Sequence, residues 1–334
     1  MNCCAKSSRI FASDILIRLL NASGVTSSLI LHTTKTITKR DNRIGIGLAL
    51  LAVIIWSGNF VVARAVFKEI PPVSLAFYRW LLASVLITPF VIHKLKPEWP
   101  LIKRSWPYLF FAALTGVALF NTFVYIGAHY STAINLTLIG TTSSPIIAVI
   151  LAAVFLKEKI GWMKIAGILL CIAGILFLLS HGDLTRLKFQ FTAGDWWVLL
   201  AALSFAIYNT LVKKKPAGIS SMTFLLLVFW MGTLMLLPFY LIEINHAAPV
   251  QWNGTIIFSI VYLGLGASVI CFPIWNIAIS KIGAARTVLF GNLILVFSSF
   301  EAVIFLNEEF TWVHIVSAAL VFAGIILSNI RSFV

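Results

Sequence analysis

The sequence predicts an all-α membrane protein with ten transmembrane helices, arranged as two inverted five-helix repeats. Three observations lead to this prediction. Hydrophobic residues make up 60% of the 334 residues and charged residues only 11%, whereas a soluble domain is about half apolar and about a quarter charged. The apolar residues form runs that are long enough to cross a bilayer. One short motif occurs twice, first with two lysines and then without them.

Residues 1–43 precede the first long apolar run and form a basic tail with seven Lys or Arg residues. Asp14 and Arg18 interrupt the mildly apolar stretch of this tail, so it lacks the continuous apolar core of a signal peptide. We interpret the tail as a poorly ordered extension, with an interfacial amphipathic helix as the alternative.

After Arg43, apolar runs alternate with short polar gaps, and each run has close to the ~20 residues that a helix needs to cross ~30 Å of hydrocarbon. A backbone in lipid must satisfy its own hydrogen bonds, so runs of this length are predicted to be helices. The ten predicted spans are 44–63, 73–92, 107–128, 132–156, 161–180, 194–212, 222–242, 254–279, 284–306 and 311–330.

The gaps between the spans differ in their positive charge. If the N-terminus is cytoplasmic, the inner gaps and the C-terminal end hold thirteen Lys or Arg residues and the outer gaps hold four. Cytoplasmic loops carry an excess of positive charge, so both termini are predicted to be cytoplasmic. The net charge of +14 therefore reflects membrane orientation. It does not form the solvated basic face of a nucleic-acid-binding protein, and nucleic acid is excluded as a partner.

The repeated motif explains the architecture. FLKEKIGW at 155–162 falls in an inner gap and FLNEEFTW at 305–312 in an outer one, where Asn307 and Glu309 replace the two lysines. AGIL at 173–176 likewise returns as AGII at 323–326. We therefore predict a first five-helix repeat over 44–180 and a second over 194–331. An odd number of spans in each repeat forces the second to be inverted. Inverted repeats are typical of secondary transporters, whose substrate site lies near the membrane midplane between the halves.

Four longer motifs carry a resemblance to a known family. They are WSGNFVVAR at 56–64, PPVSLAFYRWLLA at 71–83, Pro145 followed by VFLKEKIGWMKIAGILLCIAG at 154–174, and FLNEEFTWVHIVSAALVFAG at 305–324. Over residues 44–330 the sequence resembles the EamA-like branch of the drug/metabolite transporter superfamily. The second half departs from the pattern, because Leu295 or Val296 stands where a proline is expected and the same helix carries Glu301.

The resemblance implies a transporter, and similar members mostly export amino acids, metabolites or drugs from the bacterial cytoplasm. Related ten-helix members carry nucleotide sugars or organophosphates. We predict an exporter of small metabolites, such as amino acids or drug-like amphiphiles, in the bacterial inner membrane. An importer or facilitator of the same fold is the first alternative, and a non-transporting membrane sensor or enzyme is the second.

Arg79 and Glu301 are the two charged residues that lie more than one turn inside a predicted span, at matched depth below the outer surface. A charge at such depth is costly and is commonly functional or paired. We predict that the two form an ion pair that acts as an outer gate or coupling element. In the alternatives, Glu308 or Glu69 holds Arg79, and Glu301 rests on Ser298.

Polar and aromatic residues at mid-helix depth recur at spacings of three, four or seven, which places each pair on one helix face. Such residues also serve as hydrogen-bonding contacts between membrane helices, but a set this large is typical of a small-molecule cavity. The predicted substrate-binding residues are Trp56, Asn59, Asn121, Tyr125, Asn135, Thr142, Tyr208, Trp275 and Asn292.

Asn292 and Glu301 lie about 180° apart around one helix, so we assign Asn292 to the cavity and Glu301 to a neighbouring helix. The mid-depth set lacks Lys and Arg, whereas phosphate groups are commonly held by basic residues. This favours neutral, zwitterionic or aromatic substrates.

The remaining predictions concern partners and cofactors. The four cysteines form no CxxC pair, and the histidines lack metal-ligand spacing. We therefore expect no metal, no cofactor and no enzymatic activity. The predicted partners are a small-molecule substrate and the lipid bilayer, with a homodimer allowed.

Overall fold

The computed structural model describes most of the chain after the basic tail. The described residues are 39–156, 161–180, 182, 192–213, 215–250, 252–282, 287 and 290–329. The chain divides into two units, 1–43 and 44–334, and the fold described here is that of the second. The predictions for the tail at 1–38 and for the loop charges Lys157, Lys159, Arg186, Lys188, Lys214, Arg286 and Arg331 lie outside the described residues.

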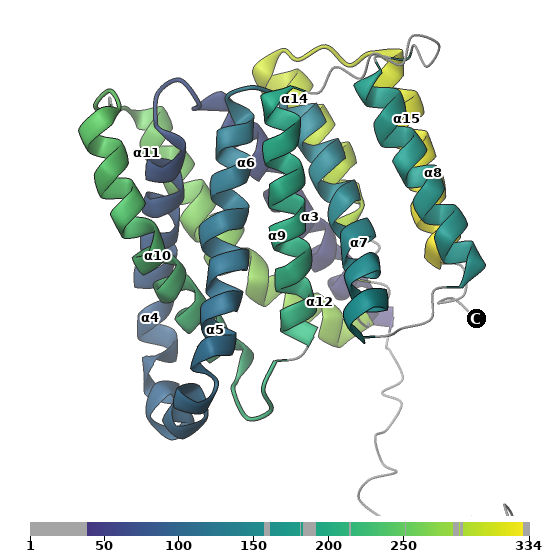
Figure 1. The fold of residues 1–334 in the computed structure, drawn as a ribbon. Coiled ribbons are helices and arrows are strands. Elements are labelled where there is room, and N and C mark those ends of the chain that lie inside the picture. The colour runs from purple at the N-terminus through teal and green to yellow at the C-terminus, as the bar shows by residue number, and fades with distance from the viewer. Residues whose placement is uncertain are drawn as a thin grey trace, which may run out of the picture. The chain divides into compact units, whose positions relative to one another are not determined.

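The described residues form helices joined by turns and short connections, with no strand among them, so the all-α prediction is confirmed (Figure 1). In chain order the helices are α3 (Lys39–Ala65), α4 (Pro72–Arg104), α5 (Trp106–Ala113), η1 (Leu114–Leu119), α6 (Phe120–Ala128), α7 (Ala133–Leu156), α8 (Trp162–Leu179), α9 (Ala193–Lys213), α10 (Ser221–His246), α11 (Gly254–Val261), η2 (Tyr262–Ile270), α12 (Cys271–Ile282), α14 (Leu293–Leu306) and α15 (Trp312–Asn329).

Many of these helices have the size and composition of membrane spans. Six helical runs within the described residues are long and apolar enough to cross a membrane: Lys39–Ala65, Pro72–Arg104, Trp106–Ala128, Ala193–Val212, Ser221–His246 and Gly254–Ile279. Three shorter described helices are also apolar. Large apolar side chains such as Phe90 and Phe305 are more than 70% exposed, which in a chain of this composition indicates a surface that faces lipid.

Helix α4 is longer than the sequence predicts. We expected a span at 73–92 followed by a loop, but the helix continues through Pro89, Pro97 and Pro100 to Arg104. Hydropathy marks the apolar part of a helix and not its end, so the charged last turns were misread as a loop. The 33 residues of α4 extend over about 50 Å, more than a bilayer core of about 30 Å requires.

Helices α4 and α10 pack together and cap each other at opposite ends. Near the end of α10, the Glu243 carboxylate accepts hydrogen bonds from the backbone N–H groups of Val73 and Ser74 at the start of α4. Near the end of α4, the Glu98 carboxylate accepts from the N–H of Ser220, the N-cap of α10. The first N–H groups of a helix have no intrahelical partner. Each helix thus supplies the other's missing acceptor, and the two run antiparallel.

Helices α8 and α15 lie side by side at one edge of the bundle (Figure 1), and their contacts are reciprocal. A Cβ added to Gly174 would lie 2.9 Å from the carbonyl oxygen of Ser317, and one added to Gly324 would lie 2.6 Å from the carbonyl oxygen of Gly167. Gly174 and Gly324 are 150 positions apart, as are Gly167 and Ser317. The missing side chains therefore allow a close, antiparallel approach in which each contact has a counterpart in the other half.

Two π-helical segments interrupt spans at matching places. Segment η1 lies between α5 and α6, and η2 lies between α11 and α12. Gly116 in η1 and Gly266 in η2 are again 150 positions apart. π-Helical turns are rare and occur frequently at functional sites, so these two segments direct attention to the residues beside them.

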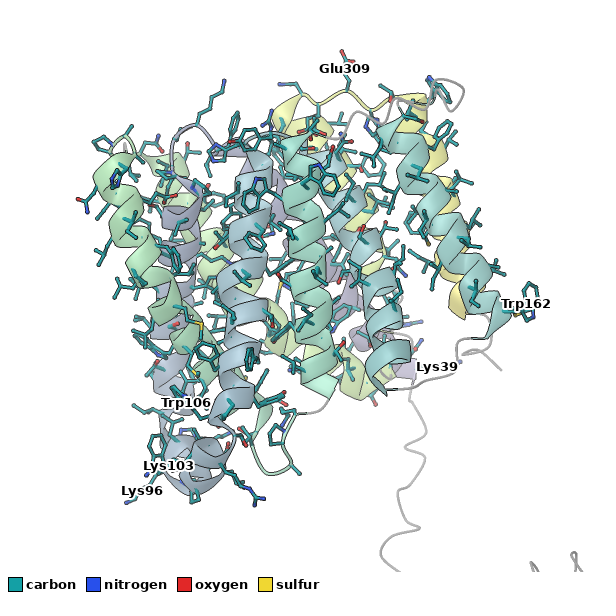
Figure 2. The ribbon with its side chains drawn as sticks, in the orientation of Figure 1. Lys39, Lys96, Lys103, Trp106, Trp162 and Glu309 are labelled. Carbon is teal, nitrogen blue, oxygen red and sulfur yellow. The ribbon has the colours of Figure 1, made fainter. Side chains whose placement is uncertain are left out.

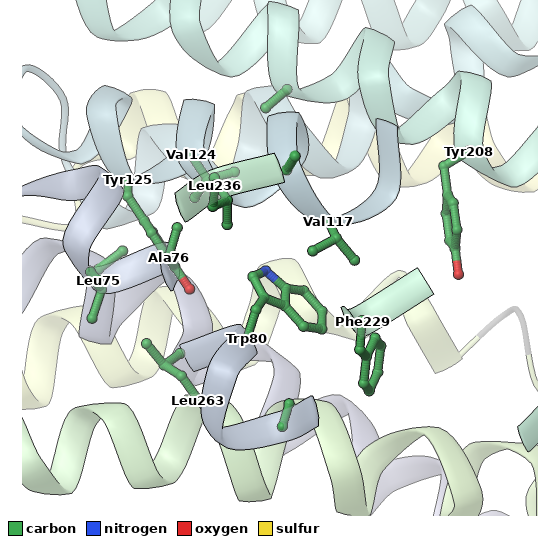
Figure 3. Close-up of a cluster of buried hydrophobic side chains, with 14 of the residues drawn as sticks. Leu75, Ala76, Trp80, Val117, Val124, Tyr125, Tyr208, Phe229, Leu236 and Leu263 are labelled. Carbon is green, nitrogen blue, oxygen red and sulfur yellow. The ribbon is translucent and has the colours of Figure 1, made fainter. Parts of the chain in front are cut away.

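The two ends of the bundle differ in their labelled residues. Figure 2 shows Lys96, Lys103, Trp106 and Trp162 toward one end and Glu309 at the opposite end. Between the ends, the largest buried apolar cluster joins α4, the α5–η1–α6 run and α10, with Trp80, Val117 and Phe229 among its members (Figure 3).

Candidate functional site

Arg79 lies in α4 and is 95% buried, with 5% of its surface exposed. Its Nη1 atom donates hydrogen bonds to Asn59 Oδ1 at 2.5 Å, Asn121 Oδ1 at 2.6 Å and the Tyr125 hydroxyl at 2.6 Å. Its Nε atom donates to Ser268 Oγ at 3.1 Å. The guanidinium thus joins α4 to α3, α6 and η2. We call these five residues the Arg79 cluster.

The π-helical segment η2 positions Ser268 for this contact. Ser268 Oγ donates to the carbonyl oxygen of Leu263, five residues earlier, which is the spacing of a π-turn. Gly264 lies beside α4, where an added Cβ would come within 3.0 Å of the Arg79 carbonyl oxygen. A side chain at Gly264 would therefore push η2 away from the guanidinium.

Three of the predicted substrate-binding residues, Asn59, Asn121 and Tyr125, meet in the Arg79 cluster. From the sequence we predicted that the helix faces carrying these residues lack Lys and Arg, and we did not group them with Arg79. That prediction is wrong, because the long Arg79 side chain reaches the same place. The cluster is therefore a positively charged site lined by neutral amide and hydroxyl groups.

The structure does not bring Arg79 and Glu301 into contact, so the predicted ion pair is wrong for this conformation. Glu301 Oε1 accepts a hydrogen bond of 2.7 Å from Ser57 Oγ in α3. Its other carboxyl oxygen, Oε2, is buried with no hydrogen-bond partner in the structure. Glu301 in α14 thus faces the neighbouring helix α3, as we predicted from its position about 180° from Asn292 around the helix. Arg79 in α4 instead contacts the amide and hydroxyl groups of the Arg79 cluster.

The alternatives for these two residues are also wrong. Glu308 accepts from the backbone N–H groups of Ala133 and Ile134 and so caps α7. Glu69 accepts from the side-chain amide of Asn253. Ser298, the expected partner of Glu301, forms a 2.6 Å hydrogen bond with Thr137 instead. Glu308 thus caps the start of one helix and Glu69 binds a side-chain amide, and neither carboxylate forms a hydrogen bond with the Arg79 guanidinium.

A second group of predicted residues is aromatic. The rings of Trp56 and Trp275 have centroids 5.1 Å apart, and Trp56 meets Phe272 edge-on at 5.7 Å. Trp56 Nε1 also donates to the carbonyl oxygen of Ala267 in η2. Trp56 thus lies one turn before Asn59 on α3, and it links α3 to the segment that carries Ser268.

The other four predicted residues form no hydrogen bond or ring contact with these two groups within the described part of the chain. Tyr208 stacks on Phe205 and Phe224, and Figure 3 shows it at the opposite side of the buried cluster from Tyr125. Asn135 Oδ1 and Thr142 Oγ1 in α7 are buried without a hydrogen-bond partner. Asn292 is half-buried at the start of α14, next to Gly291, whose added Cβ would lie 3.9 Å from Trp275.

A cavity of about 200 Å³ lies between α4, α10 and the η2–α12 run. Ile87, Met222, Leu225 and Phe272 contribute apolar walls, and Ser268 is the polar residue of the lining. Ser268 also accepts the hydrogen bond from Arg79 Nε. It therefore connects an apolar cavity to a buried cation.

The chemistry of the Arg79 cluster is suited to binding an anion. Among the described residues, no group of three or more His, Cys, Asp or Glu side chains could hold a metal ion. A buried guanidinium with neutral partners offers charge-assisted hydrogen bonds to an anion.

Sequence reasoning missed Ser57, the hydrogen-bond partner of Glu301. Ser57 follows Trp56 directly in the WSGN motif and was the one polar residue of that motif to which we assigned no role.

Comparison with known proteins agrees with this reading of the fold. The model of the EamA-like transporter family matches residues 43–180 and again 192–330. A solved crystal structure with 19% sequence identity superposes with a TM-score of 0.60 over 88% of this chain and 99% of the other, which supports the fold alone.

Similar proteins come from several organisms. An uncharacterized transporter of Archaeoglobus fulgidus is 28% identical over 85% of this chain and 96% of its own length. A probable terminal-alkyne amino-acid exporter of Streptantibioticus cattleyicolor is 26% identical over 85% and 92%. A probable amino-acid metabolite efflux pump of Escherichia coli K12 is 25% identical over 84% and 93%.

The two family matches together cover most of the chain, and its long apolar helices are suited to a membrane. The chain is therefore an integral membrane transporter that belongs to the EamA-like transporter family of the drug/metabolite transporter superfamily.

Proposed function

We propose that this chain exports small metabolites from the cytoplasm, with amino acids and drug-like amphiphiles as the substrate classes. Its two halves, residues 44–180 and 194–331, would each contribute five of ten spans in opposite orientations. Transport would proceed by alternating access between inward-open and outward-open arrangements of these halves.

The observation that carries this proposal is the reciprocity of the contacts between the halves. Gly174 meets Ser317, and their counterparts 150 positions away, Gly324 and Gly167, meet in turn. Such reciprocity is what a two-fold axis in the membrane plane would produce. The matched π-helical segments and the mutual capping of α4 and α10 support the same relationship.

The export direction and the substrate class rest on similarity. Two of the related proteins are named for the export of amino acids or amino-acid metabolites. We place the chain in the bacterial inner membrane with both termini in the cytoplasm, as the loop charges indicate. Figure 2 supports this placement, because Lys96 and Lys103 lie toward the end opposite Glu309.

Substrate contact is assigned first to the Arg79 cluster and to the Trp56–Trp275 pair, whose members come from five helical segments, α3, α4, α6, η2 and α12. The second set consists of Asn135, Thr142, Tyr208 and Asn292. Two of these, Asn135 and Thr142, have buried polar atoms that lack a protein partner, and such atoms are suited to contact water or a ligand.

Flux from proteoliposomes tests the proposal. The full chain is reconstituted, and a panel of labelled amino acids and cationic dyes is loaded on one side, with and without a pH gradient. We expect protein-dependent movement of at least one amino acid or amphiphile, absent from empty liposomes. A gradient that accelerates the flux identifies proton coupling, and flux without one identifies a facilitator. Verified insertion without movement of any panel member would contradict the proposed substrate classes.

A further inference from the structure

We propose that Arg79 binds the carboxylate of the transported molecule, and that this molecule is a monocarboxylate with an apolar side chain. The inference rests on the proposed function, because it names the substrate class of the same site. It begins from two facts. Arg79 is 95% buried, and all four groups that accept hydrogen bonds from its guanidinium are neutral.

A buried charge without a counter-charge is costly. Insertion scales give about 2.5–3.5 kcal/mol for an arginine at the centre of a membrane helix. Amide and hydroxyl oxygens solvate a cation but do not neutralise it. The carboxylates that could have paired with Arg79 are engaged elsewhere, with Glu301 bonded to Ser57 and Glu308 to the start of α7. The charge is therefore retained for a purpose other than an internal ion pair.

The geometry leaves one edge of the guanidinium available. Three acceptors crowd Nη1, whereas Nε has only Ser268, and none of the described groups accepts a hydrogen bond from Nη2. A carboxylate binds a guanidinium through two parallel N–H···O bonds. The Nε–Nη2 edge can receive a carboxylate in this way if the Ser268 hydroxyl turns aside.

The charge and the surroundings limit the ligand. The described partners of Arg79 include no second Lys or Arg, so the site carries a single positive charge, which suits a monoanion better than a phosphate dianion. Ser268 also lines the apolar cavity of about 200 Å³. A carboxylate at the guanidinium thus places an apolar side chain of the same molecule next to Ile87, Leu225 and Phe272.

The test compares acids with their matched amides on the purified full chain. Equilibrium binding is measured for L-leucine and L-phenylalanine and for the corresponding amides, with flux measured in parallel. A charge-assisted hydrogen-bond pair is expected to favour each acid over its amide by on the order of 10- to 100-fold. Arg79→Gln should remove this preference, Arg79→Lys should keep it with weaker binding, and Arg104→Gln, on the exposed end of the same helix, should leave it unchanged.

Asn121→Asp provides a second variant of nearly the same shape. It places a carboxylate 2.6 Å from Nη1, so the protein itself neutralises the guanidinium. We expect acid binding to fall by on the order of 10- to 100-fold, while the amides, which have no carboxylate and keep the cationic amino group, should bind no more weakly than before. This variant remains informative if Arg79→Gln does not fold.

Binding and flux separate two kinds of failure. If the wild-type chain binds the acids no better than the amides, or if Asn121→Asp and Arg79→Gln both leave the acid-to-amide ratio unchanged, the carboxylate site is overturned. Phenyl phosphate that binds more tightly than L-phenylalanine overturns the assignment to a monoanion. If the acids bind at Arg79 but never cross the membrane, the carboxylate site stands and the proposed export function fails.

Discussion

The Sγ atom of Cys171 in α8 lies 3.5 Å from the carbonyl oxygen of Val321 in α15, and these two residues are themselves 150 positions apart. A residue that contacts its own counterpart lies at the centre of a reciprocal interface. The glycine contacts on either side of this pair are then counterparts of each other, so the close approach of α8 and α15 depends on small residues in both halves.

The first prediction concerns Gly324. In Gly324→Ala the added methyl group meets the carbonyl oxygen of Gly167 and the backbone of Cys171 within 2.8 Å, and backbone cannot move aside as a flexible side chain can. We expect destabilisation of about 1–3 kcal/mol, typical of overpacking, measured as a lower thermal unfolding midpoint in detergent. Gly47→Ala is the matched control, because nothing lies within 4 Å of its added Cβ. Equal midpoints for the two variants would contradict the close packing.

The second prediction concerns the capping of α4. Glu243 accepts hydrogen bonds from the N–H groups of Val73 and Ser74 and from the Ser74 hydroxyl. Glu243→Gln keeps the shape but loses the charge and one acceptor oxygen, so we expect a loss of about 1–2 kcal/mol. Glu309 is an exposed residue of the FLNEEFTW motif, so Glu309→Gln should leave the unfolding free energy unchanged. The thermal unfolding midpoints of the two variants are compared with that of the wild-type chain. An unchanged midpoint in Glu243→Gln would exclude the cap as a stabilising contact.

The third prediction replaces the ion pair that the sequence suggested. Glu301 contacts Ser57 and not Arg79, and residues without contact or shared partners have nearly additive effects. A double-mutant cycle of Ser57→Ala with Glu301→Gln should show a coupling of about 0.5–3 kcal/mol in unfolding free energy, and a cycle of Arg79→Met with Glu301→Gln should be additive within about 0.5 kcal/mol. The reverse pattern would restore the Arg79–Glu301 pair.

The fourth prediction concerns the aromatic pair. Trp56 and Trp275 contact each other beside η2, so alanine at either should lower flux of apolar substrates at least several-fold while membrane levels stay normal. Trp106→Ala is the control, because Trp106 is 55% exposed and lies at one end of the bundle. Unchanged flux in Trp56→Ala and Trp275→Ala would remove these rings from the substrate site.

The sequence predicted the helical class because span length and apolarity follow directly from composition. It also predicted Asn59, Asn121 and Tyr125 as site residues, because polar groups at helical spacing in apolar runs are visible without a structure. It failed for Arg79, since depth along a helix does not reveal which neighbouring helices a long side chain reaches. The partner of Glu301 was missed for the same reason, as Ser57 lies 244 positions away.

Two features of the fold could not be read from residue patterns. The continuation of α4 to Arg104 adds charged turns that hydropathy treats as a loop. The π-helical segments η1 (LTGVAL) and η2 (YLGLGASVI) are apolar runs, so hydropathy does not separate them from the α-helical runs on either side. Segment η2 orients Ser268 toward Arg79, a contact that depends on local backbone geometry and that helical spacing does not reveal.

The opposite orientation of the two halves is the central claim, and cysteine labelling in intact cells tests it most directly. Glu309→Cys, Lys96→Cys and Lys159→Cys are each introduced after Cys3, Cys4, Cys171 and Cys271 have been replaced by alanine; Glu309 and Lys96 are exposed in the structure. A membrane-impermeant maleimide is applied from outside. We predict labelling of Glu309→Cys and no labelling of Lys96→Cys or of Lys159→Cys, the counterpart of Glu309 in the first repeat. Equal labelling of Glu309→Cys and Lys159→Cys from one side would contradict the inverted architecture.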